Sequence, residues 1–547
     1  MSSLFATYPS LRSSPELLVR HRPVLTMALT VGCALVALAG CGSSASSSAG
    51  GASSSSASAG TPVTGGNLVF ANPQDAQSLD ESTVFDNNSI WIIEQITQPL
   101  FTVTNNGKGV MPWLATGYTE STNGLAYTIS LRKGVKFSNG TPMTSKDVQF
   151  SLEQTMAASQ GWGYIDSAIK SVTAPSADTV VVNLKYKWAP ILADLALFAN
   201  GIVPDNYGGK TAAAFYNDPI GTGPFKFDYW HKGSALKLTK NTDYWQPGKP
   251  YLDSVTWTDV PDVNTRQLQV ASGQAQIDQF PAWSTVTQLK ANPAVQLSLF
   301  NSTETNYLTF NEHVAPFQDV NVRRAISYAI DREALVKAVL FGNGQPANSL
   351  FSPNVNYYDP SSGGLQYNLA DAKAAMAKSS VPKGFTTTLL VPSGNSDYAT
   401  TATIVQSELK PLGITVNIQT LDPNTANENF QSGKYDMYFS LWTMDIPDPD
   451  ELATFGLIPT SGSKSFFTFY SNPAVVKAVK NAEVTTDTAA RQADYNTAQQ
   501  DAASDAFMAF LYYSPYAYAE ASNVHGFDVT PLGNYHMEDV WLSSGSG

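Results

Sequence analysis

The stretch from 127 to 148 reads Tyr127-Thr-Ile-Ser-Leu-Arg-Lys-Gly-Val-Lys-Phe137, then Asn139-Gly-Thr-Pro-Met-Thr144, then Lys146-Asp-Val148. Its alternation of apolar and polar side chains predicts one strand at 127–131 and another at 135–137. The Asn-Gly pair that follows is typical of a tight turn, because glycine accepts a positive φ. The threonine and aspartate near the end predict a helix from 147 to about 157. Strand, turn and helix signals in one short stretch indicate a mixed α and β fold.

The same mixture continues on both sides of this stretch. Strands are predicted at 67–70, 179–184, 235–239 and 435–441, and helices at 89–98, 322–329, 332–340 and 400–412. No fixed period relates these segments, so the pattern favours an α/β or α+β fold over a repeat array.

The N-terminus has the features of a secretory signal. Three arginines precede an apolar stretch at 24–39, which is too short for a comfortable transmembrane helix. The stretch ends in Leu38-Ala-Gly-Cys41, which resembles the bacterial lipobox. That resemblance implies that Cys41 is acylated and becomes the new N-terminus. The alternative is an uncleaved anchor helix that happens to contain a cysteine.

The residues after Cys41 form a run of Ser, Ala and Gly, from 42 to 60, which is typical of a flexible tether rather than a site. Cys33 lies in the predicted signal, and Cys41 would carry lipid. The mature chain would therefore have no thiol for a disulfide or a thiolate metal site. The roughly 480 residues after the tether are enough for a large core divided into several domains.

Charge disfavours two classes of partner. The formal charge is −13, and removing residues 1–40, with three Arg and one Glu, would leave −15. An acidic body without Lys/Arg clusters would be repelled by nucleic acid and by anionic lipid headgroups. No further apolar run is long enough to span a bilayer, so we expect attachment through the lipid alone.

Four blocks of sequence resemble the large peptide/nickel-type solute-binding proteins of ABC importers, family 5. The first is the opening stretch together with Met111-Pro-Trp-Leu-Ala115, and the second is Gly221-Thr-Gly-Pro-Phe225. The third runs from Pro316 to Arg332, and the fourth is Trp442-Thr-Met-Asp-Ile-Pro-Asp-Pro-Asp450. They occur in the family order over nearly the whole mature chain. The resemblance implies a monomer that captures a solute outside the cell and delivers it to a permease and an ATPase.

The fold implied by the resemblance is α/β, of the periplasmic-binding-protein type II (Venus flytrap), with two lobes and an extra subdomain on the first. By analogy the parts are a signal peptide (1–40), a tether (41–63), lobe I (64–110 and 221–311), the extra subdomain (111–220), lobe II (312–509) and a return to lobe I (510–547). Gly221 and Gly223 predict a close backbone approach at a crossing between domains.

The fourth block supplies the candidate site. In peptide-binding members the aspartate of a Trp-x-x-Asp motif pairs with the ligand's α-ammonium, which implies that role for Asp445. Trp442 could provide an aromatic wall, and Trp283 is a further aromatic candidate. The alternative is that Asp445 only caps or turns the following proline-rich loop. Lys434 is a candidate for a ligand carboxylate only because it lies nearby in the sequence.

The sequence is also compatible with other ligands and functions. Family members also bind oligosaccharides, nickel chelates, haem or opine-like compounds, and a sensor could use the same fold. The four histidines of the mature chain are far apart, so we expect no metal cage and no cofactor; they are His231, His313, His525 and His536. Ser461-Gly-Ser-Lys464 matches the Ser-x-x-Lys of serine acyl enzymes, but no Lys-Thr-Gly follows it. We therefore expect a binding protein rather than an enzyme.

Overall fold

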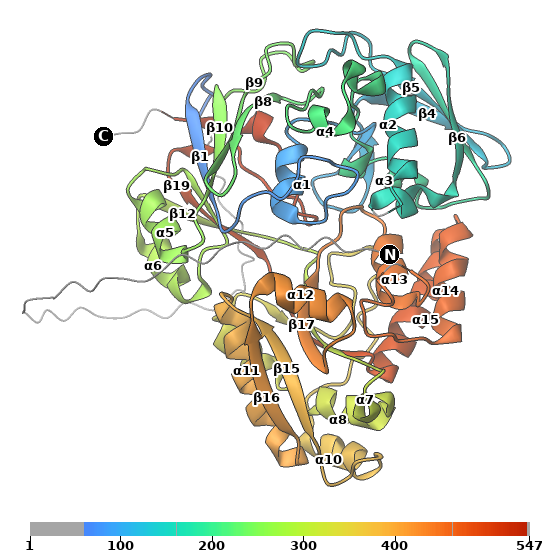
Figure 1. The fold of residues 1–547 in the computed structure, drawn as a ribbon, viewed down its shortest axis with the longest axis vertical. Helices are drawn as coiled ribbons and strands as arrows, with labels where there is room; N and C mark the ends of the chain where they lie inside the picture. Colours follow the sequence, from blue (N-terminus) through green and yellow to red (C-terminus); the bar gives the residue numbers. More distant parts are fainter. Residues whose placement is uncertain (1–59, 160, 462, 544–547) are drawn as a thin grey trace, which may run out of the picture. The chain divides into compact units, whose positions relative to one another are not determined.

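A computed structural model of the chain describes residues 60–159, 161–461 and 463–543 (Figure 1). The predicted signal peptide, Cys41 and most of the predicted tether lie outside these residues. Strands and helices are interspersed along the described chain, which confirms the α/β class. None of the described helices is both long enough and apolar enough to cross a membrane.

A seven-stranded sheet forms the first layer of the fold. Strand β1 (Asn67–Asn72) is parallel to both of its neighbours, while the other pairs are antiparallel. The order is β12 (Val295–Phe300), β19 (Tyr516–Ala521), β11 (Ile277–Gln279), β1, β10 (Ser254–Asp259), β9 (Ala235–Lys240) and β8 (Phe225–His231). Helices in the same part of the chain are α1 (Asn87–Ile93), α5 (Val263–Ala271) and α6 (Val286–Ala291), with the 3-10 turn Trp283–Thr285.

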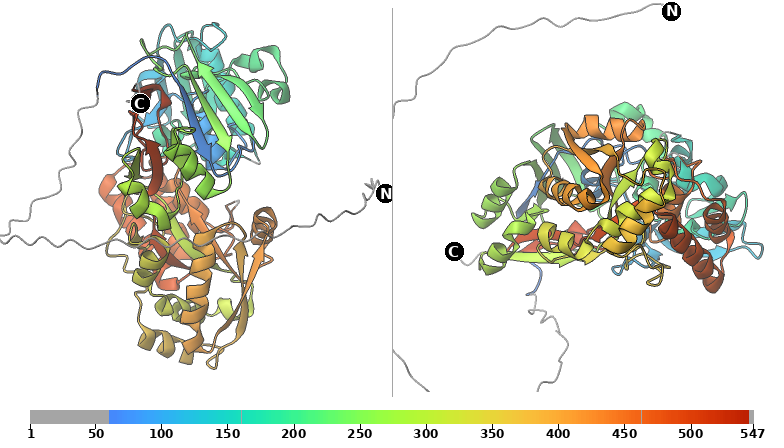
Figure 2. Two further views of the ribbon diagram at one scale, coloured as in Figure 1. Left: turned by 90° about the vertical axis from the view of Figure 1, so that its left-hand side faces the viewer. Right: turned by 90° about the horizontal axis from the view of Figure 1, so that it is seen from below.

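A six-stranded mixed sheet forms the second layer. Its order is β14 (Gln345–Pro346), β18 (Met508–Tyr513), β13 (Thr305–Phe310), β17 (Met437–Trp442), β15 (Thr386–Pro392) and β16 (Thr415–Leu421). The helices around it are α7 (Ala315–Gln318), α8 (Val320–Ala329), α9 (Arg332–Val339), α10 (Leu369–Ala377), α11 (Ser396–Leu409) and α12 (Pro423–Gln431). Figure 2 shows α11 alongside β15 and β16, drawn in orange.

A four-stranded antiparallel sheet includes one strand from the 127–148 stretch. Its order is β4 (Ala115–Glu120), β5 (Ala126–Leu131), β7 (Thr179–Leu184) and β6 (Ile169–Ser176). Helix α2 (Ser145–Ala157) packs on it, and Thr144 and Asp147 form a capping box at its start. Short helices follow: 162–168, α3 (Ile191–Asp194), 198–200, 205–209 and α4 (Ala212–Phe215).

Three helices form a separate layer next to the second sheet: α13 (Asp450–Leu457), α14 (Pro473–Val484) and α15 (Thr488–Asp505). Two small hairpins complete the fold, one between β2 (Phe101–Val103) and β3 (Val110–Pro112), the other between β20 (Val524–His525) and β21 (Trp541–Leu542). Single 3-10 turns lie at 410–412 and 537–539.

Most predicted elements are present, with two differences. The predicted strand at 135–137 is wrong: its only pairing is one bridge, Lys136 to Pro142, around a turn in which Gly140 has φ of +84°. The predicted helix at 89–98 is too long, because α1 ends at Ile93. Beyond α1 the side chain of Gln95 donates to the carbonyls of Trp91 and Tyr535, and the chain turns away.

The chain crosses between the two large sheets through two short, linked segments. Residues 301–304 join β12 to β13, and Ser514 and Pro515 join β18 to β19. The Ser302 hydroxyl donates to the Ser514 carbonyl, and the Ser514 hydroxyl donates to Glu304. The two crossings are therefore hydrogen-bonded to one another.

Gly221 and Gly223 lie against the end of α1. A Cβ atom at Gly221 would stand 1.9 Å from the carbonyl oxygen of Ile96, and one at Gly223 would stand 2.4 Å from that of Gln95. The close backbone approach predicted from the two glycines is confirmed, and its partner is the segment that follows α1.

Candidate functional site

The segment between β17 and α13 is held in place by a buried acid at the start of the helix. Oε2 of Glu451 accepts hydrogen bonds from the backbone N–H of Asp445 at 2.9 Å and of Ile446 at 3.1 Å. Glu451 is 0% exposed, and its other oxygen, Oε1, has no hydrogen-bond partner among the residues described. This role of Glu451 was not predictable from sequence, because an acid in the first turn of a helix is common.

Asp448 is a second acid that fixes the same segment. Asp448 forms a buried bidentate pair with Arg491 of α15, at 2.8 and 2.9 Å, and also accepts the backbone N–H of Asp450 at 3.0 Å. The side-chain amide of Asn356 donates to the carbonyl of Pro447 at 2.8 Å. Glu451, Asp448 and Asn356 together hold the proline-rich turn.

Asp445 itself makes none of these structural bonds. Its side chain is half-buried, and within the described parts of the chain it forms no ion pair. Glu451 fixes the backbone of Asp445, and the Glu451 carboxyl is also the neighbour of the Asp445 carboxylate. This arrangement is suited to binding a group that comes from outside the chain.

The two neighbouring carboxyl groups affect each other's ionisation. Burial raises the pKa of Asp445 to about 7, and a hydrogen bond from the Glu451 carboxyl acts in the opposite direction. Burial raises the pKa of Glu451 further, and the charge of Asp445 adds to this. The negative charge of one carboxyl therefore disfavours ionisation of the other. A carboxylate in this setting needs a cation to offset its desolvation.

The first sheet contributes residues to the same place. Nδ2 of Asn87, the first residue of α1, donates to the Thr443 hydroxyl at 3.3 Å, and Ile446 belongs to the apolar core around α1. The hydroxyl of Tyr516, on β19, lies near Asp445, whose charge contributes to raising the Tyr516 pKa after burial and the charge of Glu304. Asp445 thus lies where the two large sheets meet.

Several buried polar atoms around the Asp445 segment have no hydrogen-bond partner in the described chain. They include Oε1 of Glu451, Nε1 of Trp442 and the hydroxyl of Tyr516. Buried polar groups are nearly always paired in native proteins, so unpaired ones that gather in one place suggest a role in binding. The geometry can therefore hold a ligand that offers a cation to Asp445 and polar atoms to its neighbours.

The chain matches a known family of bacterial proteins. The model of the bacterial extracellular solute-binding proteins, family 5 (middle region) matches residues 109–464. The chain belongs to this family. The matched segment includes both the 127–148 stretch and the Trp442–Asp450 segment.

Family 5 relatives cover most of the chain. The oligopeptide-binding protein AppA of Bacillus subtilis is 30% identical over 526 residues, which span 89% of this chain and 93% of AppA. The structure of DppA from Helicobacter pylori, in complex with peptide STSA, is 28% identical, has a TM-score of 0.80 and covers 88% and 99% of the two chains. AgaA from A. tumefaciens R10, in complex with agropinic acid, is 26% identical with a TM-score of 0.78, covering 88% and 99%. The chain has the type II periplasmic-binding-protein fold of these structures.

Within this family 5 chain, Trp442 is more enclosed than an exposed aromatic wall would be. Its ring lies 5.0 Å from that of Phe455 and 4.8 Å from that of Phe466, and Phe455 contacts Tyr164 at 4.5 Å. Tyr164 belongs to the 162–168 turn beside the four-stranded sheet. Trp442 therefore lies in an aromatic group that joins this turn to α13.

The other two residues singled out by sequence lie away from Asp445. Trp283 is half-buried and packs against the apolar core of the second sheet, and no contact found in the described chain joins it to Asp445 or Trp442. Lys434 is exposed and precedes β17, whereas Asp445 follows that strand. Lys434 is thus at the opposite end of β17 from the proposed ligand position.

The histidines and the Ser-x-x-Lys motif have local contacts. His313 stacks on Phe469, His525 on Trp541 and His231 on Tyr229, while His536 pairs with Glu538 at 3.2 Å. No group of three potential metal ligands occurs in the residues described. The Ser461 hydroxyl donates to the Ile458 carbonyl at 2.7 Å, and Nζ of Lys464 lies over the Phe469 ring.

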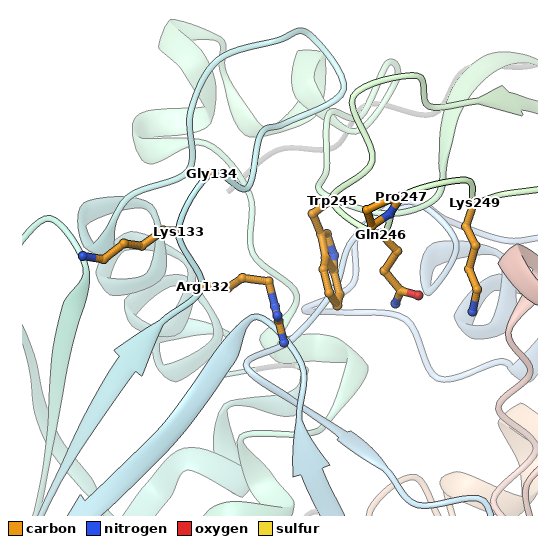
Figure 3. A pocket seen from close by; sticks show the side chains of 7 residues that line it. All are labelled: Arg132, Lys133, Gly134, Trp245, Gln246, Pro247 and Lys249. Atoms are coloured by element: carbon orange, nitrogen blue, oxygen red, sulfur yellow. The ribbon is translucent and has the colours of Figure 1, made fainter.

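A separate hollow of about 560 Å³ lies on the surface between residues 132–134 and 245–249 (Figure 3). The Arg132 guanidinium stacks over Trp245 at 4.2 Å, and its Nε donates to the Trp113 carbonyl at 3.0 Å. Lys133 pairs with Asp178, and Lys249 pairs with Asp539. Each cation of this hollow thus already contacts a partner within the protein. Asp445 does not line the hollow.

Proposed function

We propose that this chain is the extracytoplasmic solute-binding component of an ABC importer and that it captures oligopeptides, dipeptides or similar amine-bearing solutes. The observation that carries the proposal is the half-buried carboxylate of Asp445, which has no cationic partner in the described chain and whose backbone is held by Glu451 at 2.9 Å. The names of AppA and DppA, which bind oligopeptides and a peptide, support the same class of ligand.

The proposed mechanism is closure of two lobes around the ligand. Lobe I would comprise about 64–110, 221–311 and 510–547, with the extra subdomain at 111–220, and lobe II would comprise about 312–509. Asn87 and Tyr516 belong to the first, and Asp445 to the second. A ligand that contacts both lobes stabilises the closed state, and only that difference in affinity shifts the equilibrium. The importer would recognise the closed form, without a covalent step.

A peptide backbone would complete the site. Extended peptides pair with strand edges, so affinity comes from main-chain contacts with little demand on side chains. The α-ammonium would be the recognised end, because Asp445 is the free charge. No carboxylate partner is required for this mode.

Calorimetry on the purified full chain tests the proposal with a matched pair of ligands, Ala-Ala-Ala and N-acetyl-Ala-Ala-Ala. Acetylation removes the positive charge and keeps the rest of the backbone. We expect at least about a tenfold loss of affinity, and we expect Asp445→Asn to remove the difference between the two ligands. Equal affinity of the two peptides for the unsubstituted chain would overturn the proposed role of Asp445.

The membrane attachment is part of the same proposal. Acylation of Cys41, with residues 41–63 as the tether, would hold a monomeric binding domain at the outer face of the cell membrane. Cys41→Ser should release the protein into the medium, and mass spectrometry of the mature N-terminus should show a lipid only on the unsubstituted chain. Retention of the variant in the membrane fraction would contradict the lipid anchor.

A second ligand class follows from one comparison. AgaA binds agropinic acid and has the same fold, so an opine-like or sugar-derived amine is the alternative ligand. Mass spectrometry of the compounds that co-purify with the protein separates the two classes.

A further inference from the structure

Glu304 is a half-buried acid on the segment that crosses from β12 to β13. Its Oε1 accepts a hydrogen bond from Nδ2 of Asn306 at 2.7 Å and another from the hydroxyl of Ser514. Oε2 has no hydrogen-bond partner among the residues that the structure describes. The side chain is therefore held in one orientation by one oxygen while the other oxygen is free.

The pairing of the second sheet places Glu304 beside the Asp445 segment. Strands β13 and β17 are antiparallel, with Thr305 opposite Trp442, and just beyond them the backbone N–H of Met444 donates to the Thr303 hydroxyl at 2.9 Å. Glu304 thus lies opposite Thr443, two residues from Asp445. Diagonal neighbours in an antiparallel pair are about 7–8 Å apart.

Tyr516 is a further buried polar residue of this region. It is 1% exposed, and its hydroxyl has no hydrogen-bond partner in the described chain. Burial raises the pKa of Tyr516, the charges of Glu304 and Asp445 raise it further, and the side chain of Thr443, opposite Glu304, lowers it. A buried hydroxyl without a partner in this region indicates a place for a polar group from outside the chain.

No cation of the described chain neutralises this pair. Neither Glu304 nor Asp445 forms an ion pair with any described Lys, Arg or His. Glu94 is a buried acid that does have a cationic neighbour. Burial raises the pKa of Glu94 to about 8, and the charge of His536 acts in the opposite direction. The register places the two half-buried acids on the same side of the β13–β17 pair, and burial makes each costly to ionise without a compensating positive charge.

We propose that Glu304 is a second cation-binding residue of the ligand site, and that the preferred ligand carries two positive charges one side chain apart. A peptide whose first residue is Lys fits: its α-ammonium binds Asp445 and its ε-ammonium binds Glu304. This inference rests on the proposed function, in which Asp445 receives the amine.

Calorimetry with Lys-Ala-Ala and norleucine-Ala-Ala tests the proposal on the purified full chain. The two side chains have nearly the same length and shape, and only lysine has the second charge. We expect Lys-Ala-Ala to bind about tenfold more tightly at pH 7, as for one additional charge-assisted hydrogen bond. In Glu304→Gln the ratio of the affinities for the two peptides should fall to about one.

Glu428→Gln is the matched control, because it makes the same charge change on exposed α12 and should keep the preference for lysine. If norleucine-Ala-Ala binds and lysine brings no gain, the inference about Glu304 is wrong and the proposed function stands. If neither peptide binds, the proposed function itself fails. The peptide comparison uses the unsubstituted chain, so it does not depend on the folding of a variant.

Discussion

Glu451 holds the backbone of Asp445 through a 2.9 Å hydrogen bond, and a second bond of 3.1 Å fixes Ile446. The fully buried acid thus positions the more accessible one. Burial and the charge of Asp445 raise the pKa of Glu451, so the two acids do not readily carry negative charge at the same time. The position of Asp445 can therefore be tested by substitution of Glu451, and its charge by a change of pH.

Glu451→Ala should weaken ligand binding by removing the support of Asp445. Two backbone N–H groups lose their acceptor, which costs about 1–3 kcal/mol for each group left buried and unpaired. We expect the affinity for Ala-Ala-Ala to fall about tenfold in calorimetry. Glu451→Gln keeps an acceptor oxygen and should bind nearly as the unsubstituted chain does. Unchanged affinity in the alanine variant would show that Glu451 does not position Asp445.

Affinity for Ala-Ala-Ala should rise with pH between 5 and 7. The pKa of Asp445 is raised to about 7, so the carboxylate that binds the amine is mostly protonated at pH 5. The peptide's α-amino group remains protonated up to about pH 8, so it does not produce the change. Asp445→Asn should show weak binding that is independent of pH. A plateau of tight binding down to pH 5 in the unsubstituted chain would contradict the raised pKa.

Gly221→Ala should strongly destabilise the fold. The new Cβ atom would lie 1.9 Å from the Ile96 carbonyl oxygen, so the backbone would have to move. We expect the free energy of unfolding, measured with urea, to fall by more than about 3 kcal/mol. Gly117→Ala is the control, because no atom lies within 4 Å of its Cβ position. Similar stability of the two variants would rule out a close approach at Gly221.

The melting temperature should fall as pH rises from 5.5 to 8.5, in part because of Glu81. This residue is 4% exposed and accepts a hydrogen bond from the Tyr216 hydroxyl at 2.9 Å. Burial raises its pKa to about 8, and the charge of Asp80 contributes. The neutral acid is favoured in the folded state, so its stabilisation is complete below the unfolded pKa of about 4.3 and is lost as pH rises through 8.

Glu81→Gln isolates this contribution, because glutamine stays neutral and can still accept from Tyr216. Its melting temperature should change less between the two pH values than that of the unsubstituted chain. Glu428→Gln, on the surface, should leave the pH dependence as it was. An equal change in all three proteins would mean that Glu81 ionises normally.

Local patterns were enough to predict many elements. The strand predicted at 179–184 matches β7, and α2 starts at the cap given by Thr144, because period and capping depend on near neighbours. The strand predicted at 135–137 failed for the same reason. Three alternating residues look like a strand, but they had no partner beyond one bridge.

The site was only partly predictable. The fourth block pointed to the segment that contains Asp445, and its two prolines indicated a turn. Glu304 could not be found in this way, because the pairing of strands more than 100 residues apart brings it beside the Asp445 segment, and Tyr516 comes from β19 of the other large sheet. A charge in a crossing segment has no periodic signature, so only the assembled sheets show what it faces.

The hydroxyl of Ser514 links the two crossings, since it donates to Glu304 of the other segment. The two crossings run in opposite directions, and this hydrogen bond ties one to the other. In the proposed two-lobed mechanism, a ligand that binds Glu304 would therefore contact the segments about which the lobes close.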